Sequence, residues 1–496
     1  MGMVLEPNSL NPAFRATVEE GLVNSLMVRS LAHFNSKSEL VPHLAISAPQ
    51  FKKNKLEFEI RHDARWDDET PVTCADFQTG LFSQKKFRSS SIDQIEKIES
   101  AIGNSKKCSV HFRKRKPIYT LYLPPPLPTH IEKSKIEASE NEIEYLKKTQ
   151  YGLDPTFKGL ANGPYKISVY KPGYYIELER NPVFYGHKPF YDKLQIRFYN
   201  SLQGIMNAFS SQEIDMILSG LTAERAEEIQ KIITEKKLKN KIVSRASTKL
   251  IHLEFNMKRK YISDLKIRQA MSLLIDPKEL AKIVGGDGEL TGSLAHPTDP
   301  NFMTEYAQPK YKLDFKKAVQ LIKESGYVKD PVELVLTYNS ENLDRERVAV
   351  YLHNKWTSAG LKVFLKKQLK RVLIGETVKK GDFDVSVFSW SQPKLQINRS
   401  FFNPTNIPSE ANQWQGSNYA RWENKIADEA MEKADEEYDI KKIKTQLKKF
   451  YIEFNKDLPW LPLYFENRIT VVPDSFIHYT VFPDWESETY EVESWR

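Results

Sequence analysis

The sequence predicts an α/β protein with two lobes, each built on its own sheet, and a smaller α+β region. Strands alternate with helices after Pro331, and a shorter stretch near residue 200 repeats this order. The 496 residues are enough for two or three domains. A hydrophobic fraction of 40% with only 20 glycines excludes a disordered or collagen-like chain, because this composition can bury large cores.

The alternation is clearest in the C-terminal half of the chain. The order β-α-β-α-β is predicted there at 332–338, 344–359, 361–368, 370–380 and 383–390. Gly360 and Gly381 follow the two helices, where glycine commonly ends a helix. Asp314 is expected to cap a further helix that ends at Gly326. Strands separated by helices of this length pair in parallel, so we expect an open, doubly wound sheet.

A second unit of the same kind lies upstream. We expect a strand at 193–199, a helix at 202–211 and a returning strand at 213–218, hence a second parallel-sheet lobe. Between residues 36 and 163, short strand-like runs, turn residues and the proline-rich segment 123–128 predict the smaller α+β region.

The stretch 250–256 alternates between apolar and polar residues. Alternation of this kind is typical of a strand with two different faces. We expect the face that carries His252 and Glu254 to be wet or to face a ligand. The following segment 263–276 has apolar residues at helical spacing and is expected to pack in a core.

Motifs for catalysis or metal binding are missing from the sequence. The histidines form no helical pair or zinc-like cluster, and neither a phosphate-binding loop nor a G-x-S-x-G nucleophile motif occurs. The net charge of +8 is mild, and the basic clusters are scattered along the chain. We therefore expect no enzyme, no cofactor, no metal and no nucleic-acid partner.

The two cysteines, Cys74 and Cys108, are too few for a disulfide framework or a four-ligand zinc site. Nothing in the sequence says whether they meet. We expect Cys74 to be a small buried hydrophobic residue.

Short motifs then follow one another from residue 6 to Asp428. They are EPNSLNP at 6–12, LVPHLA at 40–45, RHDARWDDETPVTCADF at 61–77, NGPYK at 162–166, LERNP at 178–182, FN at 255–256, IRQA at 267–270 and NY at 418–419. In this order they resemble the bacterial extracellular solute-binding proteins of family 5, the peptide and nickel receptors of ABC importers.

The resemblance implies a two-lobed periplasmic binding protein of type II with an α+β subdomain inserted in the first lobe. Lobe one would comprise residues 1–45, 164–250 and 468–496, the inserted subdomain 46–163, and lobe two 251–467. The protein would be a periplasmic monomer that captures a peptide or peptide-like ligand and delivers it to the membrane permease of an ABC importer. Residues 1–7 lack signal-peptide features, so we interpret the signal peptide as removed.

The resemblance also implies a ligand site. In peptide-binding relatives the loop after strand 383–390 reads W-x-x-D, and its aspartate pairs with the α-amino group of the peptide. Here Pro393 replaces the aspartate, so we expect recognition that does not depend on a free α-amino group unless Glu254 substitutes for it. The expected ligand-binding residues are Ala16, Thr17, Val18, His252, Glu254, Trp390, Ser391, Gln392 and Pro393.

Plainer alternatives remain for these residues. Trp390 could be a core residue, the stretch 16–18 an edge strand, and His252 and Glu254 a solvated strand face. The ligand could instead be a non-peptide solute such as a conjugate, an opine-like compound or a metal chelate. A hydrolase is a weaker alternative.

Overall fold

The computed structural model describes the chain except residues 5, 15–16, 36–38, 53, 88–94, 114–122, 219–220, 222, 285–288, 300, 328–330, 341, 392–396, 438, 478 and 482–487. It divides into two compact units, labelled here unit 1 and unit 2. Unit 1 consists of Met1–Leu221, Arg225–Ser244 and Arg468–Arg496, and unit 2 of Thr222–Glu224 and Arg245–Asn467. The further division of the first lobe that the sequence predicts stays a prediction.

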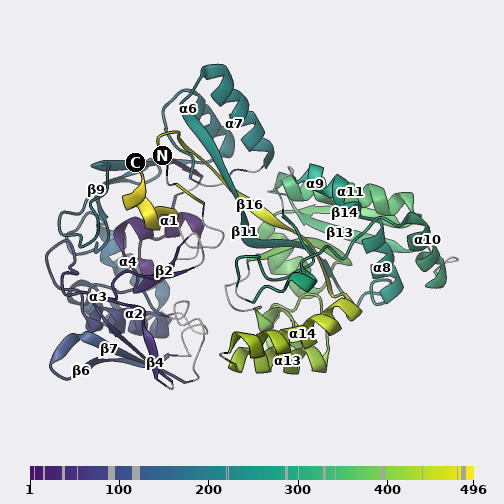
Figure 1. Cartoon of the computed structure of the whole chain (residues 1–496), viewed down its shortest axis with the longest axis horizontal. Helices are drawn as coiled ribbons and strands as arrows, with labels where there is room; N and C mark the ends of the chain where they lie inside the picture. Colours follow the sequence, from purple (N-terminus) through teal and green to yellow (C-terminus); the bar gives the residue numbers. More distant parts are fainter. Residues whose placement is uncertain are drawn as a thin grey trace. The chain divides into compact units, whose positions relative to one another are not determined.

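Unit 1 contains two four-stranded sheets, a two-stranded one and the helices packed on them (Figure 1). Its strands are β1 Gly2–Val4, β2 Ala32–Phe34, β3 Leu40–Pro42, β4 Gln50–Lys52, β5 Lys55–Glu59, β6 Ile95–Ala101, β7 Asn104–Phe112, β8 Tyr165–Lys171, β9 Tyr175–Arg180 and β10 Lys193–Tyr199. Its helices are α1 Val18–Met27, α2 Cys74–Phe87, α3 Thr129–Glu137, α4 Glu142–Lys148, α5 Gln150–Leu153 and α6 Leu202–Ser210, and most of α7 Ala223–Lys236 belongs to it.

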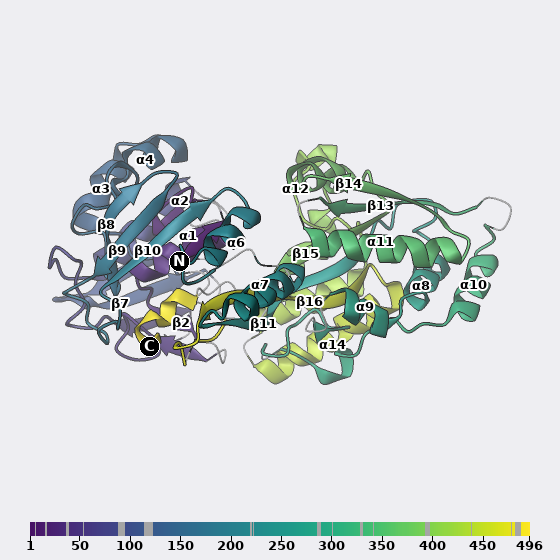
Figure 2. The ribbon, with the colours of Figure 1, turned by 90° about the horizontal axis from the view of Figure 1, so that it is seen from above.

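The expectation of a parallel sheet in unit 1 is wrong. Strand β10 and helix α6 form where predicted, but the sheet order is β1-β10-β9-β8, and only β1 and β10 are parallel. Figure 2 shows β8, β9 and β10 side by side. The neighbour of β10 on this side is β9, which forms an antiparallel hairpin with β8. A parallel sheet would have a strand connected by a crossover helix in this place. The strand expected at 213–218 is reduced to isolated bridges of Ile217 with Gly2 and Val471.

A disulfide joins Cys74 in α2 to Cys108 in β7, with Cα atoms 5.7 Å apart. The interpretation of Cys74 as a plain hydrophobic residue is therefore wrong. Both residues are buried between α2 and the sheet β4-β5-β7-β6. The pairing depends on the packing of a helix on a distant strand, so it could not be deduced from two isolated cysteines.

The Asn162–Gly163 motif holds the end of α1. The backbone N–H groups of both residues donate to the Met27 carbonyl oxygen, and the Asn162 side chain accepts from the backbone N–H of Arg29 at 2.7 Å. A Cβ atom on Gly163 would lie 2.7 Å from the Leu26 carbonyl oxygen, so only glycine fits there. This part of the family motif therefore has a structural role.

Unit 2 is built on a six-stranded sheet of order β12-β16-β11-β15-β13-β14. Its strands are β11 Asn240–Phe255, β12 Glu289–Leu290, β13 Glu333–Asn339, β14 Lys362–Gln368, β15 Val385–Ser391 and β16 Trp460–Pro473, of which β11 and β16 also carry residues of unit 1. Its helices are α8 Leu265–Leu273, α9 Pro277–Ile283, α10 Phe315–Glu324, α11 Leu343–Ser358, α12 Lys370–Val372, α13 Lys425–Glu436 and α14 Ile440–Asp457.

The predicted β-α-β-α-β unit is confirmed in unit 2. Strand β13 pairs in parallel with both β14 and β15, and α11 packs on this group (Figure 1). The expected helix at 370–380 begins as α12 and continues as a π-helical turn over Leu373–Val378. Asp314 caps α10 as predicted, accepting from the backbone N–H of Lys317 at 3.0 Å. No described helix is long and apolar enough to cross a membrane.

Candidate ligand-binding site

The carboxyl ends of the parallel strands of unit 2 form one edge of its sheet. Strand β13 ends at Asn339, β14 at Gln368 and β15 at Ser391. From β13 the chain passes through α11 to β14 on one side, whereas β15 lies on the other side of β13. Ligands of open α/β sheets bind outside the carboxyl ends of strands where connections diverge in this way. The candidate site is therefore sought at the ends of β13 and β15.

Trp390 in β15 belongs to an aromatic group on one face of the sheet. Its ring stacks on Phe401 with centroids 4.4 Å apart, and lies 5.3 Å from Phe388 and 5.8 Å from Tyr419. The side chain is half-buried, and its Nε1–H finds no hydrogen-bond acceptor among the described residues. This arrangement offers a partly exposed aromatic ring, whereas the Nε1–H of that ring is buried.

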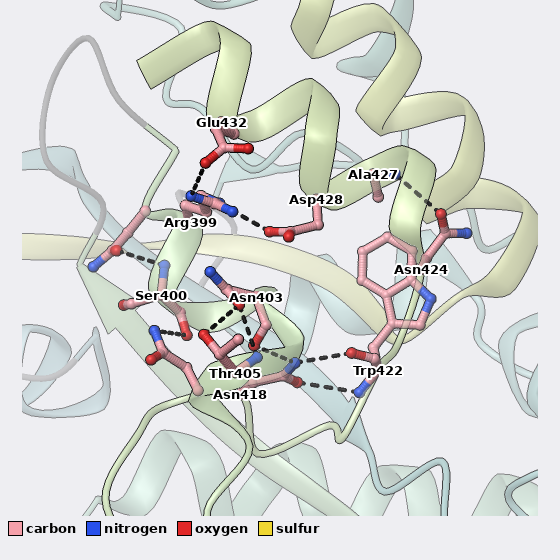
Figure 3. Close-up of polar contacts among 12 residues, drawn as sticks. Arg399, Ser400, Asn403, Thr405, Asn418, Trp422, Asn424, Ala427, Asp428 and Glu432 are labelled. Carbon is pink, nitrogen blue, oxygen red and sulfur yellow. Dashed lines mark hydrogen bonds and ion pairs between the residues drawn. The ribbon is translucent and has the colours of Figure 1, made fainter. Parts of the chain in front are cut away.

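Polar contacts hold the segment that carries Phe401 (Figure 3). Arg399 donates from Nε to Asp428 in α13 at 2.8 Å. The Asn418 side chain donates to the carbonyl oxygens of Asn403 at 3.2 Å and Trp422 at 2.9 Å. The Asn418 and Asp428 of the family motif thus fix the backbone beneath Trp390.

His252 and Glu254 lie on the same face of the sheet and are completely buried. The His252 ring stacks on Trp460 with centroids 3.9 Å apart, and Glu254 accepts from Trp460 Nε1 at 3.2 Å. The interpretation as a solvated strand face is therefore wrong, because Trp460 of β16 and the segment containing Phe401 cover it. Both His252 nitrogens and Glu254 Oε2 lack hydrogen-bond partners within the described part of the chain.

A charged group occupies the other face at the same edge. Lys249 Nζ donates to Glu466 Oε1 at 2.8 Å, and Arg345 Nη2 lies 3.7 Å from Glu466 Oε2. Arg345 Nη2 also donates to Ser389 Oγ at 2.8 Å. Lys249 is opposite Ser391 in the β11–β15 ladder, and Arg345 lies in the first turn of α11. The group therefore connects β11, β15 and β16 to the first turn of α11.

These charges perturb one another. Burial lowers the pKa of the Lys249 ammonium, and the charge of Arg345 adds to this lowering, although Glu466 opposes it. For Glu466, burial raises the pKa, but the charges of Lys249 and Arg345 outweigh this, so that its pKa is lowered. Glu466 is thus held ionised between two cations.

The other predicted site residues are distributed over both units. Thr17 caps α1 in unit 1, where its Oγ1 accepts from the backbone N–H of Glu20. Val18 is the first residue of that helix, so the alternative of an edge strand is wrong for it: the Thr17 cap starts a helix there. Ser391 is exposed at the end of β15 in unit 2. Ala16, Gln392 and Pro393 lie outside the described residues.

Sequence reasoning missed Lys249, Arg345 and Glu466. They are far apart along the chain, and each alone resembles an ordinary surface charge. Only the rule on carboxyl ends could have indicated Arg345, because it opens the helix that follows a parallel strand. Within the described ranges no three His, Cys, Asp or Glu side chains gather closely enough to hold a metal.

Comparison with known families decides what kind of protein carries this fold. Residues 39–413 match the sequence model of the bacterial extracellular solute-binding proteins, family 5 middle region. The chain belongs to this family. The oligopeptide-binding protein AppA of Bacillus subtilis strain 168 is 24% identical over 383 residues, covering 74% of this chain and 66% of AppA, just under two thirds of its length.

Solved structures of family 5 proteins share the fold over nearly the whole chain. The substrate-binding protein CtaP of Listeria monocytogenes superposes with a TM-score of 0.83 at 19% identity, covering 99% of this chain and 97% of CtaP. NikZ of Campylobacter jejuni, solved with Ni(L-His), gives a TM-score of 0.77 at 20% identity, covering 100% of this chain and 98% of NikZ. The predicted family and the two-lobed α/β fold are confirmed, and this family consists of solute-binding proteins.

Proposed function

We propose that the protein is the solute-binding receptor of an ABC importer and captures a peptide or peptide-like ligand between its two lobes. The observation that carries this proposal is the family match over residues 39–413. The sequence relatives include the oligopeptide-binding protein AppA of Bacillus subtilis and a periplasmic oligopeptide-binding protein of Haemophilus influenzae. Binding by closure needs no nucleophile or cofactor, so the proposed function is non-enzymatic.

The proposed location is the periplasm, with the signal peptide removed. The Cys74–Cys108 disulfide supports an exported protein, because such bonds persist in oxidising compartments and are rare in the cytosol. The proposed partner is the membrane permease of the importer, and the receptor acts as a monomer without nucleic acid.

The proposed recognition does not require a free α-amino group. Pro393 occupies the position at which peptide-binding relatives carry an aspartate, and a buried ammonium without a counter-charge would cost several kcal/mol. Glu254 is the acid that could substitute, since its Oε2 has no hydrogen-bond partner in the described structure. The same proposal includes ligand-binding roles for Thr17, Val18, His252, Trp390 and Ser391, and for Ala16, Gln392 and Pro393, which lie outside the described residues.

A receptor for a non-peptide solute is the second candidate. The loss of the aspartate at Pro393 favours it, because a conjugate, an opine-like compound or a metal chelate need not present an α-amino group. A hydrolase is less well supported, as no nucleophile motif occurs in the sequence.

Native mass spectrometry of the purified protein, before and after denaturation, tests the proposal. We expect a retained small molecule of peptide or peptide-like mass. Calorimetry with free and N-acetylated versions of the same short peptides then tests recognition: the unmodified protein should bind both alike, and Pro393→Asp should favour the free form. Strong preference of the unmodified protein for the free amine would contradict recognition without the amine. Absence of any retained or titrated peptide would contradict the peptide class.

A further inference from the structure

Helix α14 presents lysines to solvent along one side. The side chains that it buries are Ile443, Leu447, Phe450, Tyr451 and Phe454, which all lie on one side of the helix. At 3.6 residues per turn, the residues on the opposite side are Lys441, Lys442, Thr445, Lys448, Lys449, Ile452 and Lys456. All of them are exposed. We call these residues the lysine face.

The lysine face contains no acidic residue, and its charges are poorly compensated. Lys442 Nζ lies 3.8 Å from Glu437, and Lys456 Nζ lies 3.5 Å from Glu453. Both distances are long for a charge-assisted hydrogen bond. Within the described ranges no ion pair is made by the other lysines of the face, which are Lys441, Lys448 and Lys449. The face is therefore a strip of positive charge.

The neighbouring helix α13 has the pattern of an ordinary solvated surface. It packs beside α14 (Figure 1). Its exposed charged side chains alternate between the two signs, and they are Lys425, Glu429, Glu432, Lys433 and Glu436. Surfaces that serve solubility usually intersperse both signs in this way. The single sign of the lysine face therefore requires another explanation.

The residue types on the lysine face favour a diffuse anionic surface over a folded protein partner. Protein interfaces are enriched in arginine and large aromatic residues and depleted in lysine. The lysine face has neither arginine nor an aromatic residue. A lysine ammonium is a point charge on a flexible stem, so it needs no partner group in a fixed geometry. The apolar side of α14 is packed in a core of unit 2, so the folded helix offers charge attraction without insertion into a bilayer.

We infer that the lysine face of α14 docks on the anionic headgroups of a phospholipid membrane. Clusters of about four to eight basic residues on a helix are typical of binding to anionic lipids. The inference goes beyond the proposed function, because it concerns a surface apart from the residues proposed to bind the solute. A receptor that delivers its solute to a membrane permease would be concentrated beside that permease by such docking.

Cosedimentation with lipid vesicles gives the first test. The vesicles contain phosphatidylglycerol and phosphatidylcholine in equal parts, or phosphatidylcholine alone. We expect the protein to bind the anionic vesicles only. Binding should weaken as the salt concentration rises from about 0.01 M to about 0.15 M, because the Debye length falls from about 30 Å to about 8 Å. Equal binding to both kinds of vesicle, or binding to neither, would overturn the inference.

Charge removal then tests the position of the contact. Each lysine near an anionic membrane contributes a factor of about five to binding, so a triple variant of the face should bind the anionic vesicles at least about tenfold more weakly. This variant is Lys441→Gln/Lys448→Gln/Lys449→Gln. A matched variant removes the same charge from exposed positions of α10 and should lose less than about threefold. It is Lys316→Gln/Lys317→Gln/Lys323→Gln. Equal losses in the two variants would show that net charge alone drives binding, and would overturn the inference.

A fluorescent label reports which surface meets the membrane. A dye on Thr445→Cys, in the centre of the lysine face, should become shielded from acrylamide when anionic vesicles are added, whereas a dye on Gln320→Cys in α10 should stay accessible. Cys74 and Cys108 are bonded and buried, so the dye reaches only the new cysteine. Equal shielding at the two positions would contradict docking through α14.

These assays need no captured solute, so they remain decisive if the proposed solute is wrong. The triple variant of the lysine face should retain the same copurified molecule as the unmodified protein in native mass spectrometry, and circular dichroism confirms that it is folded. A loss of vesicle binding that occurs only together with unfolding of this variant would overturn the inference.

Discussion

The two units stabilise similar amounts of sheet by different means. Unit 1 combines several small sheets, a disulfide and buried polar groups such as Glu132, which accepts hydrogen bonds from Tyr145 at 2.6 Å and Thr149 at 2.9 Å. Unit 2 contains one six-stranded sheet between apolar layers and has no cysteine. The comparison teaches that small layers need cross-links, whereas a wide sheet is held by the packing of its own helices.

Removing the disulfide should give the largest effect. The double variant Cys74→Ala/Cys108→Ala opens a loop of 34 residues, which the chain-entropy relation equates with about 4 kcal/mol. Hydrogen exchange followed by mass spectrometry should show faster exchange in α2 and β7, with unit 2 unchanged. If hydrogen exchange became faster to the same extent in both units, the disulfide would not be a stabilising feature of unit 1 alone.

The corresponding change in unit 2 removes packing. Leu352 in α11 is completely buried, so Leu352→Ala should cost about 3 kcal/mol through lost transfer energy and a cavity. Val350 in the same helix is 40% exposed, and Val350→Ala should cost less than about 0.5 kcal/mol. Denaturant unfolding measures both. A similar cost for the two would contradict the apolar layer beneath α11.

Acid should weaken unit 1 before unit 2. Burial lowers the pKa of His43 well below its usual value, and Arg29, His33 and Arg61 add to this lowering. The unfolded state takes up a proton near pH 6.5, whereas the folded state does not, so stability falls as the pH drops below about 6.5. The slope should not exceed about 1.4 kcal/mol per pH unit for this group.

His43→Gln should flatten this dependence between pH 6.5 and 5, as followed by thermal unfolding across pH. Exchange in the C-terminal segment should report the change locally, because Tyr490 stacks on His33, whose ring is 4.4 Å from that of His43. An unchanged slope in the variant would assign the acid sensitivity to other groups.

Helix caps should give the smallest effect and should not differ between the units. Ser201 accepts from the backbone N–H of Gly204 at the start of α6, and Asp314 does the same for Lys317 in α10. Ser201→Ala and Asp314→Ala should each cost about 1 kcal/mol, and Ser201→Gly only a few tenths. Chemical denaturation measures these costs, and a large difference between the two caps would mean that tertiary contacts dominate one of them.

The sequence predicted the elements that depend on residues close together along the chain, and missed the contacts between residues far apart along it. Strand β10, helix α6 and the β13–β15 unit depend on local periodicity and were found close to their bounds. The antiparallel neighbours of β10 depend on which hairpin packs beside it, which local periodicity does not reveal. The burial of Glu254 requires Trp460, which lies 206 residues away.

The candidate site depends even more on residues that are distant along the chain, which local sequence patterns do not bring together. The family resemblance pointed to Trp390, because this residue begins the stretch that corresponds to the W-x-x-D loop of peptide-binding relatives. Lys249, Arg345 and Glu466 come from three elements and carry no shared motif. Charges of this kind become a group only when the strand order is known.

The division of the chain also sets an order of completion during synthesis. Apart from Thr222–Glu224, unit 2 is a single stretch that ends at Asn467, whereas unit 1 needs residues from Arg468 onward. Those last residues are not peripheral: Val471 bridges to Ile217, and Val472, Phe476 and Trp495 lie in the core of unit 1. The unit that begins at the N-terminus is therefore the one that must wait for the C-terminus, and a chain cut short near its end would carry a finished second half on an unfinished first.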